Sequence, residues 1–302
     1  MKTVAITGAT GFIGRRIVGA ALKAGWAVRA LSRDPARVVP QANVIAVRWD
    51  MDGPISHEFL VGADAICHGA AFRPDYLGDE KSAARCMEAN AEGTLRLLRA
   101  ATDANVPRFV YLSAGNAYAQ GTGPFAETAQ LFPDGRASYY LTSKLVGEIY
   151  VSHWDREGRI SGCSLRISSV YGPGMDRRGL IPAMAAKLRA GQTVRLKNGG
   201  GFGGDMVCVD DVADAAVAAL SSQHRGALNI GSGHYTTARE IAQLLAGMLQ
   251  VSPDLVEIAP AGPPEPGFGQ LDISRARCEL DYQPTPLSKG LVQLLATMDY
   301  GV

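Results

Sequence analysis

The chain has 302 residues, of which 47% are apolar and 20% are charged, a composition typical of a folded globular protein and not of a disordered one. Thirty Lys and Arg side chains nearly balance 29 Asp and Glu, so charge gives no reason to expect a nucleic acid or an anionic membrane as a partner. No apolar run approaches the roughly 18 residues of a membrane span, and no leader-like segment follows Met1, so we expect a cytoplasmic protein.

The first half of the chain alternates short apolar segments with longer helical patterns. Strands are predicted at residues 4–7, 27–31, 44–47, 65–68, 109–113 and 163–167. Helices are predicted at 15–24, 89–104 and 140–154. Continuous apolar strands separated by helices are typical of parallel βαβ units covered on both faces. We therefore expect an α/β fold with a doubly wound parallel sheet.

The second half has a mixed pattern that begins after about Arg166. Gly172-Pro173-Gly174 interrupts the chain, and a glycine-rich loop is predicted at residues 199–204. Helices are predicted at 180–188, from Asp210-Asp211 to about residue 220, at 237–249 and at 287–298. A strand is predicted at 193–196, and the Pro- and Gly-rich stretch 259–269 is interpreted as a loop.

The cysteines form no recognisable site, because their number is odd and no two are spaced as CxxC. We expect neither a disulfide framework nor a bound metal, and we interpret these residues as small buried apolar groups. They are Cys67, Cys86, Cys163, Cys208 and Cys278.

A glycine-rich motif, Gly8-Ala9-Thr10-Gly11-Phe12-Ile13-Gly14, lies between the first predicted strand and the first helix. Small residues let the backbone approach a pyrophosphate, and a helix N-terminus offers free N–H groups and positive potential. The motif predicts a dinucleotide site and makes the sheet one of the Rossmann type. The expected cofactor residues are Gly8, Thr10, Gly11, Phe12, Ile13 and Gly14.

The second strand ends in Leu31-Ser32-Arg33-Asp34. An acidic residue at this position would bind the adenosine ribose of NAD, but Ser32 brings no negative charge. The Arg33 guanidinium is suited to the 2′-phosphate of NADP, so we favour NADP over NAD. The alternative is an ordinary solvated Arg33 paired with Asp34.

Tyr140 and Lys144 are spaced i, i+4 on a predicted helix, so both side chains lie on one face. A phenol is a poor acid or base at neutral pH because its pKa is about 10. A neighbouring ammonium stabilises the phenolate and is expected to move the pKa of Tyr140 toward neutrality. Tyr139 is five residues from Lys144 and does not share this face.

With these two motifs the chain resembles the extended short-chain dehydrogenase/reductases, also called the NAD-dependent epimerase/dehydratase family. The resemblance covers nearly the whole chain, because further segments are similar to the family's own in the same order. They are Trp49-Asp50-Met51, His68-Gly69-Ala70-Ala71, Asn90-Ala91-Glu92-Gly93-Thr94, Leu165 to Gly174, Val209 to Ala213 and Asn229-Ile230-Gly231-Ser232-Gly233.

The resemblance implies a division of labour along the chain. Residues 1–166 would form the dinucleotide-binding Rossmann domain. Residues 167–302 would mainly form a smaller C-terminal substrate-binding lobe, with about 205–232 packing back on the first domain. Lys144 would hold the nicotinamide ribose, and Tyr140 would exchange a proton with a substrate oxygen during hydride transfer. Further cofactor contacts are expected from Asp50, Met51, Ala70, Asn90 and Ile167, besides Tyr140 and Lys144.

The segment before Tyr140 leaves three alternatives for the third catalytic residue. Relatives usually carry Ser or Thr in a Ser-Ser-x-x-Val-Tyr-Gly segment, which corresponds here to residues 113–119. Alignment on Tyr118 puts Ala114 at the hydroxyl position and Ser113 one place early, where the strand period of two turns it to the other face. Either the turn shifts and Ser113 serves as catalytic residue, or Asn116 polarises the substrate, or this hydrogen bond is missing.

Departures from the family pattern bear on the substrate. Gly115 and Asn116 replace the Asp-Glu pair of sugar-nucleotide dehydratases, which disfavours 4,6-dehydration. Ser169 stands where many relatives have Asn, and Gly204 where they have a diphosphate-binding Arg. The substrate is therefore an unusual nucleotide sugar or no nucleotide sugar. Compensation by Arg177, Arg178, Arg195 or Lys197 is conceivable, and Phe72, Asn116 and Ser169 are expected to contact the substrate.

The leading hypothesis is an NADP-preferring oxidoreductase that acts on a keto or secondary-alcohol carbon of a sugar or a natural-product ketone. One alternative is a nucleotide-sugar epimerase with a tightly bound cofactor. Another is a dinucleotide-sensing binding protein without turnover, against which the presence of Tyr140 and Lys144 counts.

The resemblance also implies a homodimer that pairs helices 89–104 and 140–154. Leu95, Leu98, Leu145, Ile149 and Trp154 are the candidate interface residues.

Overall fold

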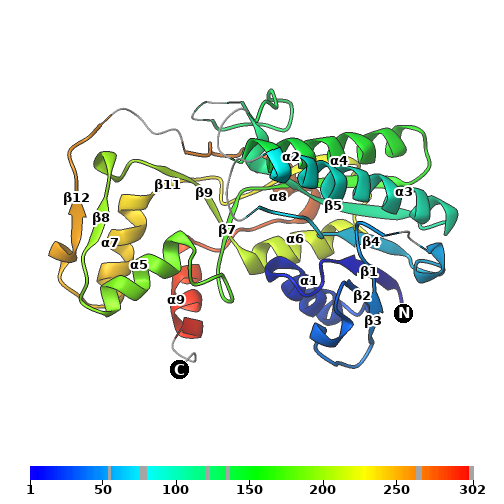
Figure 1. The fold of residues 1–302 in the computed structure, drawn as a ribbon, viewed down its shortest axis with the longest axis horizontal. Coiled ribbons are helices and arrows are strands. Elements are labelled where there is room, and N and C mark those ends of the chain that lie inside the picture. The colour runs from blue at the N-terminus through cyan, green and yellow to red at the C-terminus, as the bar shows by residue number, and fades with distance from the viewer. Residues whose placement is uncertain are drawn as a thin grey trace.

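The computed structural model describes residues 1–53, 56–74, 80–119, 121, 123–133, 137–262 and 267–298. A seven-stranded sheet in the order β10-β6-β5-β4-β1-β2-β3 forms its centre, and every neighbouring pair is parallel (Figure 1). This confirms the predicted α/β, Rossmann-type doubly wound fold. The strands are β1 (Thr3–Thr7), β2 (Ala27–Ser32), β3 (Val44–Arg48), β4 (Ala65–His68), β5 (Arg108–Ala114), β6 (Ser161–Ile167) and β10 (Gly226–Ile230).

Helices cover both faces of the sheet, which explains why its central strands are buried and mostly apolar. On one face α1 (Phe12–Lys23) and α6 (Val209–Ser221) pack over Val4, Ile6 and Val28. On the other face α3 (Gly93–Asp103) and α4 (Ser138–Arg156) pack over Ala5, Ile66 and Phe109. The two pairs of helices lie on opposite sides of the sheet in Figure 1.

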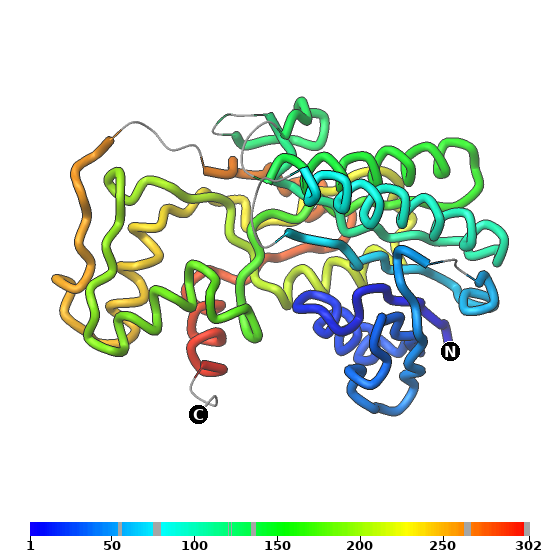
Figure 2. The backbone as a smooth tube through the Cα atoms, in the orientation of Figure 1, coloured from blue at the N-terminus to red at the C-terminus, as the bar shows by residue number. Residues whose placement is uncertain are grey.

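A second, smaller body of structure lies beside the sheet and has its own apolar core (Figures 1 and 2). It contains a three-stranded sheet in the order β11-β9-β7 and a two-stranded sheet of β12 and β8. Its elements are β7 (Ser169–Tyr171), α5 (Leu180–Arg189), β8 (Val194–Leu196), β9 (Gly203–Cys208), β11 (Tyr235–Thr237), α7 (Ala238–Met248), β12 (Val256–Ile258) and α9 (Leu287–Met298).

Part of the second half of the chain belongs to the large sheet. β10 pairs with β6 as the edge strand, and α6 packs against α1. The helix α8 (Ser274–Leu280) lies against β10 and α6. The functional division of the chain at residue 166 stays a prediction.

Several elements differ from the sequence-based expectations. The helix predicted at 89–104 begins earlier: α2 (Glu80–Cys86), a π-helical segment (Met87–Glu92) and α3 follow one another. The predicted loop 199–204 ends in a strand, because Gly203 and Gly204 pair with Thr237 and Thr236. The strands β7, β10, β11 and β12 and the helix α8 were not predicted, because short segments of this kind take their form from their neighbours. Of the predicted loop 259–269, residues 263–266 lie outside the described residues.

The cysteine prediction is wrong at one position. Four cysteines are buried, as expected, but Cys278 on α8 is exposed. Within the described ranges no group of three or more His, Cys, Asp or Glu is placed to hold a metal ion. The same ranges contain no helix that is both long and apolar enough to span a membrane.

Candidate active site

The glycine-rich turn lies at the carboxyl end of β1, between β4 and β2, where the chain order of the sheet reverses. Gly8 has φ +70°, a conformation that favours glycine, and its carbonyl accepts the Gly11 N–H at 2.9 Å. A Cβ at Gly14 would lie 2.0 Å from the Gly8 oxygen, so the first turn of α1 packs directly on the loop. Open backbone and a helix N-terminus that begins at Phe12 are the features of a pyrophosphate cradle.

The end of β2 is tied to this turn by side chains. The hydroxyls of Thr10 and Ser32 are 3.1 Å apart, and the Asp34 N–H donates to Ser32 Oγ at 3.2 Å. The Asp34 carboxylate accepts the Ala36 N–H and does not pair with Arg33. Arg33 is exposed, and within the part of the chain that the structure describes its guanidinium makes no hydrogen bond or ion pair. The alternative of an Arg33–Asp34 pair is therefore not observed.

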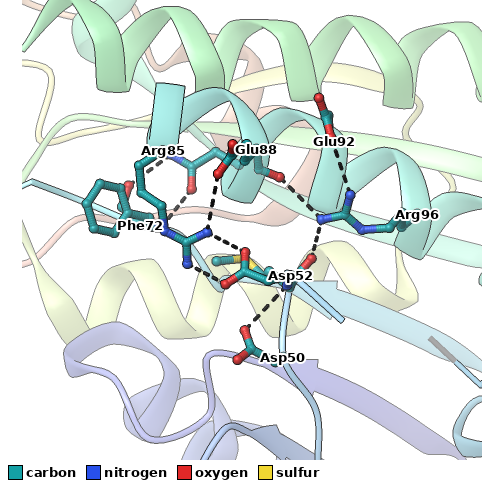
Figure 3. A network of polar contacts seen from close by, with 9 residues as sticks. Asp50, Asp52, Phe72, Arg85, Glu88, Glu92 and Arg96 are labelled. Carbon is teal, nitrogen blue, oxygen red and sulfur yellow. Dashed lines mark hydrogen bonds and ion pairs between the residues drawn. The ribbon is translucent and has the colours of Figure 1, made fainter. Parts of the chain in front are cut away.

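The segment that follows β3 is clamped by two arginines (Figure 3). Arg85 of α2 forms a bidentate pair with Asp52, which holds the pKa of this carboxyl below its usual value. Arg96 of α3 donates to the Met51 carbonyl, and the Asp52 N–H donates to Asp50 at 3.4 Å. The clamp holds the segment with the expected adenine residues, Asp50 and Met51, against α2 and α3. Both arginines escaped the sequence analysis, since long-range ion pairs leave no spacing signal.

A buried chain of hydrogen bonds runs from β1 through β4 to α3. The Ala70 N–H donates to Thr7 Oγ1 at 3.1 Å, Thr7 Oγ1 lies 2.6 Å from His68 Nδ1, and His68 Nε2 lies 3.0 Å from Thr94 Oγ1. Because Thr94 donates its hydroxyl proton to the Asn90 carbonyl, it must accept from His68 Nε2–H. His68 Nδ1 then accepts from Thr7. This chain is satisfied only by a neutral imidazole, in agreement with burial, which lowers the pKa of His68 well below its usual value.

Asn90 links the loop after β4 to the catalytic helix. It lies in the π-helical segment, a conformation often found at functional sites. Its Oδ1 accepts the Phe72 N–H at 2.6 Å, and its Nδ2 donates to the Phe72 carbonyl and to Ser143 Oγ, both at 2.9 Å. Ser143 in turn donates to the Tyr140 carbonyl at 2.7 Å. The position of Tyr140 is thus set by residues from two other elements.

Tyr140 and Lys144 both lie in α4, one turn apart. Lys144 is 2% exposed, and burial lowers its pKa to about 7, with the Glu148 carboxylate acting in the opposite direction. Its ammonium lies 4.0 Å from the centre of the Tyr111 ring. The pair predicted from the sequence is therefore brought onto one helix face inside the protein.

The expected lowering of the pKa of Tyr140 is not seen. Burial raises the pKa of the Tyr140 phenol, and the cation that acts against this rise is the Arg73 guanidinium. Desolvation penalises a buried phenolate more than a charge at some distance stabilises it. Arg73 lies next to Phe72 in the loop after β4. The sequence analysis did not find it, because nothing in its local pattern distinguishes it.

The Ser113 hydroxyl is hydrogen-bonded to a residue of α4 two turns beyond Tyr140. Its Oγ donates to Glu148 Oε2 at 2.6 Å, and the other Glu148 oxygen is held by Arg166 at 2.6 Å. Glu148 is two turns, about 12 Å, beyond Tyr140 along α4. Tyr140 instead packs against the apolar cluster that contains Ala114. Of the three alternatives, the structure disfavours the first, in which a shifted turn lets Ser113 serve.

The remaining predicted substrate residues come from three segments. Asn116, after β5, donates to Ser169 Oγ of β7 at 3.5 Å. A Cβ added at Gly204 would lie 3.6 Å from Ser169 Oγ and 3.3 Å from the Phe268 Cβ, so Phe268 covers Gly204, the position at which the resemblance implies an arginine in relatives. Phe72, in the loop after β4, is half-buried.

Two arginines proposed as substitutes for the missing one are engaged elsewhere. Arg178 pairs with Asp176 at 2.8 Å, and Arg195 pairs with Glu257 at 2.8 Å, both on exposed surface. Compensation by either residue is therefore disfavoured, since each guanidinium already has a carboxylate partner. Ile167, the last predicted cofactor residue, is buried at the end of β6.

Comparisons with known proteins show the family to which this chain belongs. The family model described as the NAD dependent epimerase/dehydratase family matches residues 4–231. The chain is 30% identical to a UDP-glucose 4-epimerase of Mycolicibacterium smegmatis over 97% of both chains. It is 33% identical to a dTDP-6-deoxy-L-talose 4-dehydrogenase (NAD(P)(+)) of Kitasatospora kifunensis over 97% of this chain and 94% of that one.

Solved structures are similar over the whole length. A UDP-glucose 4-epimerase of Thermus thermophilus in complex with NAD has a TM-score of 0.83 at 26% identity, covering 99% of this chain and 100% of that one. A dTDP-glucose 4,6-dehydratase of Streptomyces venezuelae with NAD bound has a TM-score of 0.84 at 25% identity, covering 99% and 97%.

Proposed function

The chain belongs to the NAD dependent epimerase/dehydratase family, an enzyme family of the short-chain dehydrogenase/reductase type, and on this premise we propose that it transfers hydride between a nicotinamide cofactor and a keto or secondary-alcohol carbon of a sugar. The observation that carries the proposal is the Tyr140–Lys144 pair on one helix face, with Tyr140 partly buried, Lys144 buried, and both linked by Asn90 and Ser143 to the loop after β4. A non-nucleotide natural-product ketone is a further substrate candidate, because Gly204 offers no side chain to a diphosphate and Phe268 packs over it.

The residues present fit a dinucleotide. Close packing requires glycine at Gly8 and Gly14, because a Cβ at either position would collide with backbone, so the turn presents backbone and no side chain at these two positions. We assign Gly8, Thr10, Gly11, Phe12, Ile13 and Gly14 to the pyrophosphate, Arg33, Asp50 and Met51 to the adenosine, and Ala70, Asn90, Tyr140, Lys144 and Ile167 to the nicotinamide half. When bound, the cofactor supplies or accepts the hydride.

The protein's own part in the reaction is to hold the substrate oxygen and move one proton. Tyr140 donates a proton to the carbonyl oxygen during reduction and accepts it during oxidation. The Lys144 ammonium stabilises the negative charge that develops on the phenol oxygen. Ala114 leaves the usual hydroxyl donor missing, so we assign the second hydrogen bond to the Asn116 amide, with Ser169 beside it as a substrate contact.

A keto-sugar and ketone panel tests this function. Each compound is incubated with the protein and NADPH or NADH, and the absorbance of the reduced nicotinamide is followed. Net oxidation of the cofactor supports the proposal. If no member of the panel, and no matching alcohol with the oxidised cofactor, changes the absorbance or the substrate, the proposed reaction is wrong.

Epimerisation is the second candidate, because the Mycolicibacterium relative that matches 97% of the chain is a 4-epimerase. An epimerase regenerates its cofactor in each turnover. It would therefore convert UDP-glucose to its 4-epimer without a net change in nicotinamide absorbance. Proton NMR of the sugar product distinguishes the two reactions.

The first prediction concerns cofactor choice. We propose a preference for NADP, since Ser32 brings no carboxylate and the exposed Arg33 guanidinium makes no hydrogen bond or ion pair within the described residues, acting only at a distance on Asp52. Arg33→Ala is expected to weaken NADP by roughly 1–3 kcal/mol, the value of a charge-assisted contact, and to leave NAD binding unchanged. Fluorescence titration with both dinucleotides measures this. Equal or tighter binding of NAD by the unaltered protein would contradict the preference.

The second prediction concerns assembly. We propose a cytoplasmic homodimer that pairs α3 and α4 with their copies. Leu98 and Trp154 are buried in the core, whereas Ile149 on α4 is 54% exposed and free to pack in an interface. Ile149→Lys is expected to convert the dimer to a monomer, because a charge would then be buried between apolar surfaces. Light scattering at micromolar concentration measures the mass, and a wild-type protein that is only monomeric rejects the proposal.

A further inference from the structure

We propose that Tyr111 is the positioning residue for Lys144: its buried ring fixes the ammonium and holds it in the charged form. The inference rests on the proposed function, in which Lys144 acts as a cation. Tyr111 lies in the middle of β5 and belongs to none of the motifs recognised in the sequence.

Tyr111 holds Lys144 at both ends of the residue. The ring centre is 4.0 Å from Lys144 Nζ, and the Tyr111 hydroxyl donates to the Lys144 backbone carbonyl at 3.2 Å. A Cβ at Gly147 would lie 2.4 Å from the Tyr111 hydroxyl, so glycine at 147 makes room for the phenol against α4. The strand β5 thereby fixes both the side-chain rotamer of Lys144 and the position of this turn of α4 relative to the sheet.

Lys144 requires such support because its charge is costly where it lies. It is 2% exposed, and burial lowers its pKa to about 7, so much of the charge would be lost near neutral pH. A cation within about 6 Å of an aromatic face is stabilised, and more strongly when water is excluded. The Tyr111 ring is fully buried, so its face meets the ammonium without competition from solvent.

The other ionisable groups around Lys144 do not replace this contact. Glu148, on the same helix, favours the ammonium but is already paired with Arg166. His68, from β4, lies 5.6 Å from the Tyr111 ring and is neutral. The pKa of Tyr111 is raised well above its usual value by burial, so its phenol also stays neutral.

Two further groups near the pair act on Tyr140 and not on Lys144. Arg73, after β4, and Cys86, at the end of α2, both influence the Tyr140 phenol, which lies one turn before Lys144. Neither acts on the lysine itself. The aromatic face of Tyr111 is thus the support of the Lys144 ammonium that comes from a different element of the fold.

The test separates the ring's electrostatics from its shape. Tyr111→Phe removes the hydroxyl, and a series of phenylalanines with increasing ring fluorination at position 111 then weakens the π face with little change in size. The pKa of Lys144 is read from the side-chain carbon resonance of ¹³C-lysine-labelled protein, assigned by its loss in Lys144→Met. The same fluorinated residues at Phe109, buried on the same face of β5, serve as the control.

Fluorination at 111 is expected to lower the pKa of Lys144 stepwise, by roughly one pH unit in total, because the ammonium loses the attraction of the π face. The loss of activity at high pH should move to lower pH by the same amount. Fluorination at 109 should change neither. If the titration of Lys144 is the same across the series at 111, the inference is wrong. Full activity of Tyr140→Phe would instead overturn the proposed function, and the resonance titration would still test the contact.

Discussion

Tyr140→Phe is expected to lower turnover by roughly 10²–10⁴-fold, the usual contribution of a positioned general acid or base. The substitution keeps the ring against Ala114 and Leu141 and removes only the hydroxyl. The Ser143 bond goes to the Tyr140 backbone carbonyl, so the helix turn keeps its anchor. Cofactor affinity and thermal stability should therefore stay close to those of the unaltered protein. Turnover is measured on the substrate found in the panel, and cofactor affinity by titration.

Tyr139→Phe is the matched control for this prediction. Tyr139 is the preceding residue of α4, with 42% of its surface exposed, and it undergoes the same loss of one hydroxyl. Its variant should keep full turnover. Full activity of the Tyr140 variant together with an inactive Tyr139 variant would show that Tyr139, and not Tyr140, transfers the proton. Full activity of both would exclude phenol-mediated proton transfer and favour a binding or sensing role.

Lys144→Met is expected to lower turnover at least about 10²-fold and to make the protein more stable. The catalytic loss follows from removal of the proposed electrostatic partner of Tyr140, one turn along α4, and of the expected ribose contact. The gain in stability follows from burial, because the lysine is 2% exposed and a methionine of similar length places no charge there. Activity and stability should therefore change in opposite directions at this single position.

The gain in stability expected from Lys144→Met depends on pH. The pKa of Lys144 is about 7 in the folded protein and 10.5 in its ordinary state, so the unfolded chain binds the extra proton between these values. The free energy of unfolding of the unaltered protein should then rise with pH across this window. The advantage of the Met variant is largest below pH 7, at roughly 4 kcal/mol, and disappears near pH 10.

Urea denaturation at pH 6.5 and at pH 10 measures this difference. Lys187→Met, on the exposed surface of α5, is the control and should show no such pH-dependent gain. A Lys144 variant that is less stable than the unaltered protein at pH 6.5 would show that the ammonium is a net stabilising group. Retained turnover would show that it has no part in the chemistry.

Local patterns were sufficient for much of the fold and for the centre of the site. The strands β1, β2, β4 and β5 were predicted because both of their faces are buried, which makes most of their residues apolar. The glycine turn at Gly8 and the Tyr140–Lys144 pair were predicted because their geometry depends on residues only a few positions apart. The strand β9 was missed because Gly203 and Gly204 have low strand propensity and pair only with distant β11.

Tertiary structure decided what surrounds the reacting groups. Ser113 was an open candidate until folding placed its hydroxyl on Glu148, 35 residues away. The Tyr111 ring comes under Lys144 from a different strand, and the neutral state of His68 depends on Thr7 and Thr94, 61 and 26 residues away. Burial even reversed the expected direction of the Tyr140 pKa shift. Spacing along a helix determines which side chains share a face, but the local dielectric and the partners of a charge depend on the elements packed around it.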